Sequence, residues 1–163
     1  MTSDDCLILE NQLCFPLYVA SKEIIKRYRP FLETIDLTYT QYITMLVLWE
    51  KKSINVKDLG KRLFLDSGTL TPLLKSLEAK GLVNRTRSTN DERIMLITIT
   101  EKGNALKEKA QNFPVQMSSC IKLSAEESAD LCRLLKKNIR LIFFYGLQNQ
   151  TPSLGFSGVT PRT

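Results

Sequence analysis

Residues 55–81 read NVKDLGKRLFLDSGTLTPLLKSLEAKG, and this stretch decides the fold. Asn55 and Asp66 are residue types that cap helix N-termini, and Gly81 is the type that ends a helix in the left-handed conformation. The pattern predicts two helices, over residues 56–64 and 67–80. Because only the turn Phe64-Leu65-Asp66 separates them, this stretch is predicted to be a helix-turn-helix.

A β-hairpin is predicted directly after these helices. Residues 94–99 are β-branched and apolar, which predicts a strand, and residues 82–88 are expected to pair with it. The residues between them, Thr89-Asn90-Asp91-Glu92, are typical of a turn. We call this hairpin the wing. The prediction is a mainly α fold with a small β-hairpin wing, in which residues 37–100 form a winged helix-turn-helix.

Further helices are expected on both sides of this region. Thr38 with Gln41, and Ser124 with Glu127, form capping-box patterns, and Thr100 is a further N-cap. Pro16 is tolerated only near a helix start, which places Cys14 in or beside a first turn. The expected helices span about residues 11–33, with Pro30 as a kink or end, then 38–52, 101–118 with a bend at Pro114, and 125–148.

The first and last of these helices carry apolar stripes that exceed what a small winged-helix core can cover. We expect them to be buried against a second copy of the chain, as a homodimer. Residues 8–36 and 101–148 would form this helical dimerisation region within a single domain, residues 1–163. Residues 151–163 are rich in Pro, Gly, Ser and Thr and are expected to be a disordered tail.

Charge and composition limit the function classes. The net charge is +6, and residues 51–93 hold ten basic and five acidic side chains, so this segment carries most of the excess. Localised positive charge favours a polyanion partner such as DNA. The chain has no histidine, which removes Ser-His-Asp and Cys-His catalysis. Its four cysteines lack C-x2-C spacing, so we expect no metal and no cofactor.

The compartment is expected to be the cytoplasm. No run of 18 apolar residues exists, and the acidic N-terminus lacks a signal-peptide pattern, so no membrane partner is expected. Standing structural disulfides are rare in that compartment, whereas redox-responsive thiols are compatible with it. Cys14, in the apolar and aromatic run Leu13-Cys14-Phe15-Pro16-Leu17-Tyr18, is then a candidate chemical sensor, because a helix start favours the thiolate.

The residues 63–75 resemble the recognition helix of MarR-family regulators, and Asp91-Glu92-Arg93 followed by residues 96–103 resembles the family's wing and its exit. The N-terminal residues 11–15, with Tyr18, Tyr28, 37–39 and 41–42, are similar to the organic-hydroperoxide repressor subfamily (OhrR-like), including SarZ-like staphylococcal thiol regulators. The resemblance covers about residues 8–146.

This resemblance implies a thiol pocket. Cys14 matches the peroxide-reactive cysteine, Tyr28 and Tyr39 match tyrosines that hydrogen-bond its sulfur, and Tyr18, with Phe15, lines the pocket. Tyr28 lies 14 residues after Cys14, or about 21 Å along one helix, so it could reach only the sulfur of a partner subunit. Spacing alone leaves open that the tyrosines are ordinary interface aromatics.

The remaining thiols have different expectations. Oxidation would first give a sulfenic acid, which condenses with a second thiol. Cys120 resembles the resolving cysteine of two-cysteine members, and a low-molecular-weight thiol is the alternative. Cys132 is expected to be a packing thiol among leucines, and Cys6 to be incidental.

For DNA, short hydroxyls near the start of a recognition helix can read base edges, and Lys75 can reach phosphate or guanine. An alternative is that Thr69 and Thr71 only satisfy groups of their own helix. The resemblance assigns Asp91 and Arg93 to a wing pair whose arginine enters a narrow minor groove. The expected DNA-contacting residues are Ser67, Thr69, Thr71, Lys75, Asp91 and Arg93, with phosphate contacts from Lys57, Lys61, Arg62, Arg85 and Arg87.

The predicted function is a cytoplasmic dimeric transcriptional regulator, a repressor rather than an enzyme. It would bind a pseudo-palindromic operator in double-stranded DNA and lose that binding when organic hydroperoxide oxidises Cys14. Three alternatives stay open. They are a MarR-like repressor released by a small aromatic ligand, a thiol peroxidase, and a purely structural dimerisation module.

Overall fold

The computed structural model describes residues 7–148, so the expectations for Cys6 and for the tail 151–163 lie outside the described residues. The chain divides into two compact units, Met1–Cys120 and Ile121–Thr163. Within residues 7–148 we find no helix with the length and hydropathy needed to span a bilayer.

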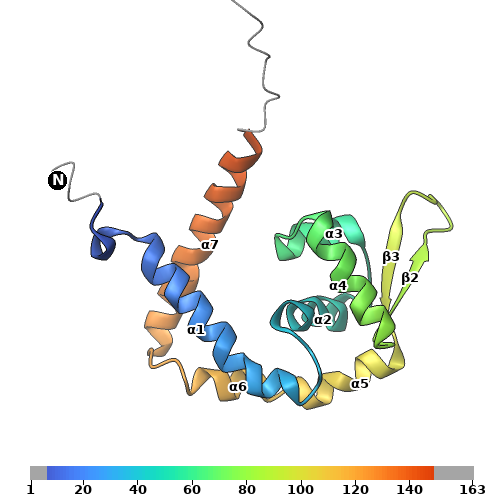
Figure 1. The fold of residues 1–163 in the computed structure, drawn as a ribbon, viewed down its shortest axis with the longest axis horizontal. Coiled ribbons are helices and arrows are strands. Elements are labelled where there is room, and N and C mark those ends of the chain that lie inside the picture. Colours follow the sequence, from blue (N-terminus) through green and yellow to red (C-terminus); the bar gives the residue numbers. More distant parts are fainter. Residues whose placement is uncertain (1–6, 149–163) are drawn as a thin grey trace, which may run out of the picture. The chain divides into compact units, whose positions relative to one another are not determined.

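Among the described residues, every helix and strand except the last helix belongs to the first unit (Figure 1). In chain order these are η2 (Leu9–Asn11), α1 (Cys14–Glu33), α2 (Tyr39–Lys51), β1 (Ser53–Asn55), α3 (Val56–Leu63), α4 (Ser67–Ala79), β2 (Val83–Arg87), β3 (Met95–Ile99), α5 (Glu101–Ala110) and α6 (Phe113–Ser118). The second unit contains α7 (Ala125–Gln148), which is preceded by the expected capping box of Ser124 and Glu127.

The helix starts follow the capping residues, as predicted. Thr38 accepts from the backbone N–H of Gln41 and donates its own backbone N–H to the Gln41 side chain, a complete capping box. Asn55, Asp66 and Thr100 each accept from the backbone N–H three residues later. Gly81 has a φ of 71° after α4, as expected of a helix-ending glycine. Pro30 lies inside α1, which continues to Glu33.

The sheet contains a third strand beside the two strands of the wing. β2 and β3 pair antiparallel with Arg85 opposite Ile97, which confirms the hairpin. β1 pairs with the other edge of β3, giving the strand order β1-β3-β2. β1 was not predicted, because its three residues end in Asn55, whose side chain caps α3, and carry no alternating strand pattern.

The prediction of one bent helix over residues 101–118 is wrong. The chain forms α5 and α6 as separate helices, with a break at Gln111 and Asn112. Pro114 stands in the first turn of α6, where its missing N–H costs no helical hydrogen bond. The proline therefore starts a new helix rather than bending an existing one.

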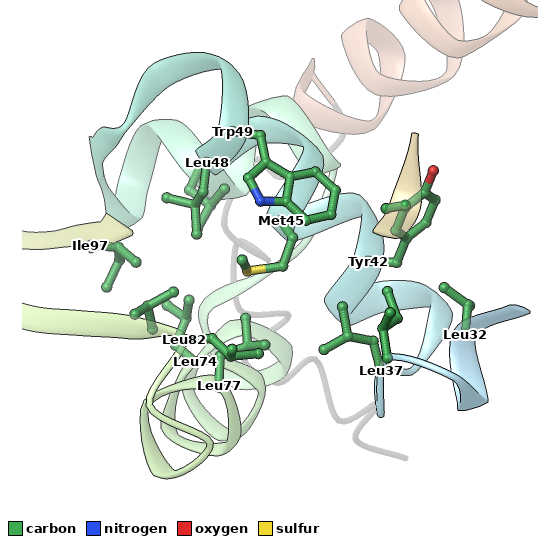
Figure 2. Close-up of a cluster of buried hydrophobic side chains, with 14 of the residues drawn as sticks. Leu32, Leu37, Tyr42, Met45, Leu48, Trp49, Leu74, Leu77, Leu82 and Ile97 are labelled. Carbon is green, nitrogen blue, oxygen red and sulfur yellow. The ribbon is translucent and has the colours of Figure 1, made fainter. Parts of the chain in front are cut away.

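The core of the first unit lies between α2, α4 and the sheet (Figure 2). Met45, Leu48 and Trp49 of α2 meet Leu74 and Leu77 of α4, all at most 5% exposed. On the inward side of α4, Leu70 and Leu74 are buried and Leu73 packs against the core. The Trp49 indole N–H donates to the Gly103 carbonyl at 2.9 Å, which attaches α5 to α2.

Candidate functional site

The reactive-thiol candidate lies at one end of α1. Cys14 is the first residue of that helix and is exposed. Phe15 and Tyr18 are beside it with 39% and 62% of their surfaces exposed. Because α1 runs unbroken to Glu33, Tyr28 lies about 21 Å along the axis from Cys14. One chain therefore does not bring its own Cys14 to Tyr28.

A cluster of tyrosine rings lies at the other end of α1. The ring of Tyr28 is 5.2 Å from that of Tyr39 and 5.7 Å from that of Tyr42, centroid to centroid. The structure thus brings together the two predicted pocket tyrosines. Tyr42, which belongs to the subfamily resemblance but was not predicted to line the pocket, joins them. It is 2% exposed and also contacts Phe113 of α6. We call Tyr28, Tyr39 and Tyr42 the tyrosine cluster.

Burial affects the acidity of these phenols. The pKa of Tyr28 is raised, first by desolvation and then by the neighbouring Tyr39. The pKa of Tyr42 is raised to about 12, again mainly by desolvation. Both groups therefore stay protonated at neutral pH, and a protonated phenol can donate a hydrogen bond to an anion.

The other described thiols are exposed. Cys120 follows α6 in a turn, as expected, with its sulfur 3.7 Å from the carbonyl oxygen of Gln116. Cys132 belongs to α7 in the second unit. Cys132 and the α7 leucines at 131 and 134, which are 43% and 48% exposed, are uncovered in the single chain, so the expectation that Cys132 packs among leucines stays a prediction.

The outer side of α4 carries polar residues. Ser67, Thr69, Thr71 and Lys75 are all exposed. Thr69 donates its hydroxyl to the Asp66 carboxylate at 3.2 Å, and Thr71 donates to the Ser67 carbonyl at 2.8 Å. Both hydroxyl protons thus serve the helix in this structure, while the hydroxyl oxygens can still accept hydrogen bonds. The Thr69 backbone N–H is the main cause of the lowered pKa of Asp66.

The basic residues fall into two groups. Arg62 pairs with Glu50 at 3.2 Å, Lys61 with Asp58 at 3.6 Å, and Arg85 with Glu78 at 3.5 Å. Only 21% of the Arg85 side chain is exposed, so this arginine is turned toward α4 rather than outward. Lys57 and Lys75 are exposed on α3 and α4. An exposed acidic partner could be exchanged for a DNA phosphate at little cost in free energy, because ion pairs at the protein surface are weak.

The end of the wing is held by side-chain contacts to the backbone. Arg87 donates to the Glu92 carbonyl oxygen at 3.1 Å. Asp91 accepts from the backbone N–H of Arg93 at 2.9 Å, which shapes the turn from which the exposed Arg93 side chain projects. Among residues 7–148 there is no cluster of three Asp, Glu, His or Cys side chains that could hold a metal ion.

The chain is similar to known regulators of transcription. A family model described as transcriptional regulator SarA/Rot matches residues 21–110. The chain is 49% identical over 127 residues to the organic hydroperoxide resistance transcriptional regulator of Bacillus subtilis, covering 78% of this chain and 86% of that protein. It is 48% identical over 135 residues to the regulator SarZ of Staphylococcus saprophyticus, covering 83% and 92%.

A solved structure of a third regulator is similar as well. Reduced AbfR bound to DNA, a protein of Staphylococcus epidermidis, matches with a TM-score of 0.72 and 34% identity, over 86% of this chain and 99% of that chain. AbfR has also been solved with a disulfide formed. The relatives are named as regulators of transcription, and the matched fold is a winged helix-turn-helix.

Proposed function

Because this chain belongs to the SarA/Rot family of MarR-like transcriptional regulators, we propose that it is a dimeric repressor that releases DNA when organic hydroperoxide oxidises Cys14. The observation that carries the proposal is the position of Cys14 at the exposed start of α1, about 21 Å along the helix from Tyr28. A thiol pocket containing both residues needs two chains.

The thiol chemistry needs no metal or cofactor. The Cys14 thiolate attacks one peroxide oxygen, the O–O bond breaks, and the alkoxide leaves and takes a proton as the alcohol. The sulfur is oxidised to a sulfenic acid. A second thiol then displaces hydroxide from that sulfur, giving a disulfide and water. We propose Cys120 of the partner subunit as this second thiol, supported by its exposure in the turn after α6. A low-molecular-weight thiol is the competing route.

The tyrosine cluster would support the reduced state. The phenol O–H groups of Tyr28 and Tyr39 can donate hydrogen bonds to a thiolate from the partner, and such donation favours the anion. A sulfenic acid or disulfide is neutral and larger, so oxidation replaces this arrangement. Because α1 carries both Cys14 and Tyr28, a change at the thiol is a change at the subunit interface.

The proposed DNA contacts follow the exposed side of α4 and the wing. Ser67, Thr69 and Thr71 would meet bases in the major groove through hydroxyl oxygens and methyl groups, and Lys75 a phosphate or guanine. Arg93 would enter the minor groove, with its backbone held by Asp91. Lys57, Lys61, Arg62 and Arg87 would contact phosphates. Arg85 is the weakest member, since its Glu78 partner must first be displaced. Two such sets, one per subunit, fit half-sites one helical turn apart.

The decisive experiment replaces Cys14. The Cys14→Ser variant should bind a DNA duplex selected by the reduced wild type with an affinity within about threefold of wild type. A hydroperoxide should release wild-type protein, and a reductant should restore its binding, while the serine variant keeps binding throughout. Cys132→Ser is the matched control and should respond like wild type. Release of the Cys14→Ser variant by hydroperoxide would disprove the sensor assignment.

A second candidate is a repressor released by a small aromatic ligand. It is favoured by a pocket of about 390 Å³ between α2 and the α5–α6 break, lined by Tyr42, Leu46, Trp49 and Pro114 among others. Small ligands bind in pockets of this size lined by aromatic side chains. Release of DNA by a phenolic compound, with no response to hydroperoxide, would select this candidate over the thiol sensor.

A further inference from the structure

The start of α2 is joined to the C-terminal half of α4 by a polar link. Gln41 donates its Nε2 to Ser76 Oγ at 3.0 Å, across 35 residues of sequence. Gln41 is one of the buried polar residues of the chain, at 6% exposure. Removing the acceptor would leave a buried amide without its partner, and burial makes such a loss costly.

The orientation of this amide is determined by the helix cap. The backbone N–H of Thr38 can only donate, and it donates to Gln41 Oε1 at 3.0 Å. Oε1 therefore faces the cap, and Nε2 faces α4. A single side chain thus completes the first turn of α2 and binds the recognition helix.

Lys80 supplies a second link immediately after α4. Its ammonium donates to the carbonyl oxygen of Asp36, pairs with the Asp36 carboxylate at 3.1 Å, and lies 3.5 Å from Gln41 Oε1. Asp36 stands between α1 and α2 in the left-handed conformation, with a φ of 52°. This backbone conformation is unusual for a residue with a side chain, and the Lys80 contacts hold it in place.

The tyrosine cluster lies on the two helices that flank this α1–α2 turn. Tyr28 lies on α1 before the turn, and Tyr39 is the first residue of α2 after it, two residues from Gln41. From this attached end, α4 extends about 20 Å to Ser67, because its 13 residues rise 1.5 Å each. A small rotation at the attached end becomes a larger displacement of Ser67 and Thr69.

We propose that Gln41, Ser76 and Lys80 are positioning residues that transmit a change in the tyrosine cluster to the recognition helix. The proposal rests on the DNA-binding part of the proposed function, and it does not require the oxidation step. Movement of the α1–α2 turn pulls the C-terminal end of α4 through two links, Gln41–Ser76 and Lys80–Asp36. DNA affinity thereby depends on the packing of the tyrosines.

A double-mutant cycle on DNA affinity tests this coupling. The probe is a duplex selected by the reduced wild-type protein from a random pool, with a scrambled duplex as control. Tyr39→Leu and Ser76→Ala should each weaken binding by about 3- to 10-fold. If the two residues are coupled, the loss of DNA affinity in the double variant should be smaller than the product of the two single-variant losses, by a factor of at least about three. The reason is that both changes interrupt the same path. Ser76→Ala keeps the α2 capping box and leaves Gln41 in place.

The control cycle pairs Tyr39→Leu with Ser53→Ala. Ser53 also loses one hydroxyl hydrogen bond, to Thr98 at 3.0 Å, but lies on β1 rather than at the α2–α4 junction. The fold losses of DNA affinity caused by these two changes should multiply in the double variant. If the losses caused by Tyr39→Leu and Ser76→Ala also multiply, within about twofold, the coupling proposal is overturned.

Variants of Lys80 separate positioning from folding. Lys80→Met should lower DNA affinity and show the same coupling to Tyr39→Leu, while Lys80→Arg, which keeps a cation, should restore both. The melting temperature of each variant identifies any that fails to fold, and the Lys80 cycle then replaces the Ser76 cycle. Coupling without a hydroperoxide response in the wild type would reject the oxidation step alone. A response to hydroperoxide without coupling would reject this inference alone, and failure to select any duplex would reject both.

Discussion

At the scale of single residues, Cys14 and Cys120 are both exposed thiols of the first unit. Exposure allows each to react, but only a partner thiol can convert a sulfenic acid into a disulfide. After hydroperoxide treatment, non-reducing electrophoresis of wild-type protein should show a band at twice the chain mass. Cys120→Ser should abolish that band, whereas Cys132→Ser should keep it. If wild-type protein runs only as monomer, the external-thiol route is favoured. Treatment with hydroperoxide in the presence of a low-molecular-weight thiol such as free cysteine should then give a mixed disulfide on Cys14 that mass spectrometry detects.

Tyr42 provides a second residue-scale prediction. Its pKa is raised from 10.0 to about 12, mainly by desolvation. A raised pKa in the folded chain stabilises the fold fully below pH 10, and this contribution is lost as pH rises through about 12. Between pH 8 and 11.5, the free energy of unfolding measured with urea should therefore fall more for wild type than for Tyr42→Phe, by on the order of 1 kcal/mol.

The matched control for this titration is Phe31→Leu, which changes a ring that contacts Phe113, the neighbour of Tyr42. This variant should follow the wild-type dependence on pH, because it removes no titrating group and leaves the Tyr42 phenol in place. Equal slopes for wild type and Tyr42→Phe would show that the Tyr42 phenol is not desolvated in the folded protein.

At the scale of elements, the first turn of α5 is pressed against the chain that leaves α4. A Cβ on Gly103 would lie 2.2 Å from the carbonyl oxygen of Leu82, a backbone atom that cannot move aside cheaply. Alanine favours a helix over glycine by about 1 kcal/mol, but overpacking of this kind costs about 1–3 kcal/mol or more. Gly103→Ala should lower the melting temperature by several degrees.

Gly68→Ala is the comparison for this prediction. Gly68 also lies in a first turn, that of α4, but its Cβ would meet only the Asp66 carboxylate, at 3.0 Å. This change should cost less than Gly103→Ala, since the carboxylate can shift. A melting temperature for Gly103→Ala equal to that of wild type would mean that α5 is free to move away from Leu82.

At the scale of the whole molecule, the apolar side chains exposed at the start of α1 form part of the proposed dimer surface. Leu13, Leu17 and Tyr18 are 71%, 41% and 62% exposed. Leu17→Glu should convert a dimer to monomers in sedimentation velocity and weaken DNA binding by more than tenfold, because a single winged helix holds one half-site. Far-ultraviolet circular dichroism should be unchanged, since Leu17 lies outside the buried core.

Leu46→Glu is the matched control for the oligomeric state. Leu46 lies on α2 and is 43% exposed, nearly the same as Leu17. The charge it introduces should leave the sedimentation coefficient of the dimer unchanged. A monomeric wild type would disprove the proposed dimer, whereas a dimer that survives Leu17→Glu and dissociates with Leu46→Glu would move the interface away from α1.

The sequence by itself determined the local part of this fold. Thr38, Asn55, Asp66 and Thr100 mark the starts of α2, α3, α4 and α5, because an N-cap acts on a backbone group only three residues away. The hairpin was predictable for the same reason: turn chemistry and β-branched runs are short-range signals. The position of Cys14 at the start of α1 followed from Pro16 alone.

Only the tertiary structure decided what these elements bring together. The joining of Tyr42 to Tyr28 and Tyr39, the Trp49–Gly103 hydrogen bond across 54 residues, and the Gln41–Ser76 hydrogen bond across 35 depend on how helices pack. The three-residue strand β1 exists because β3 is there to pair with it. Contacts between residues far apart in the chain arise from the packing of the complete core, and no short segment encodes them.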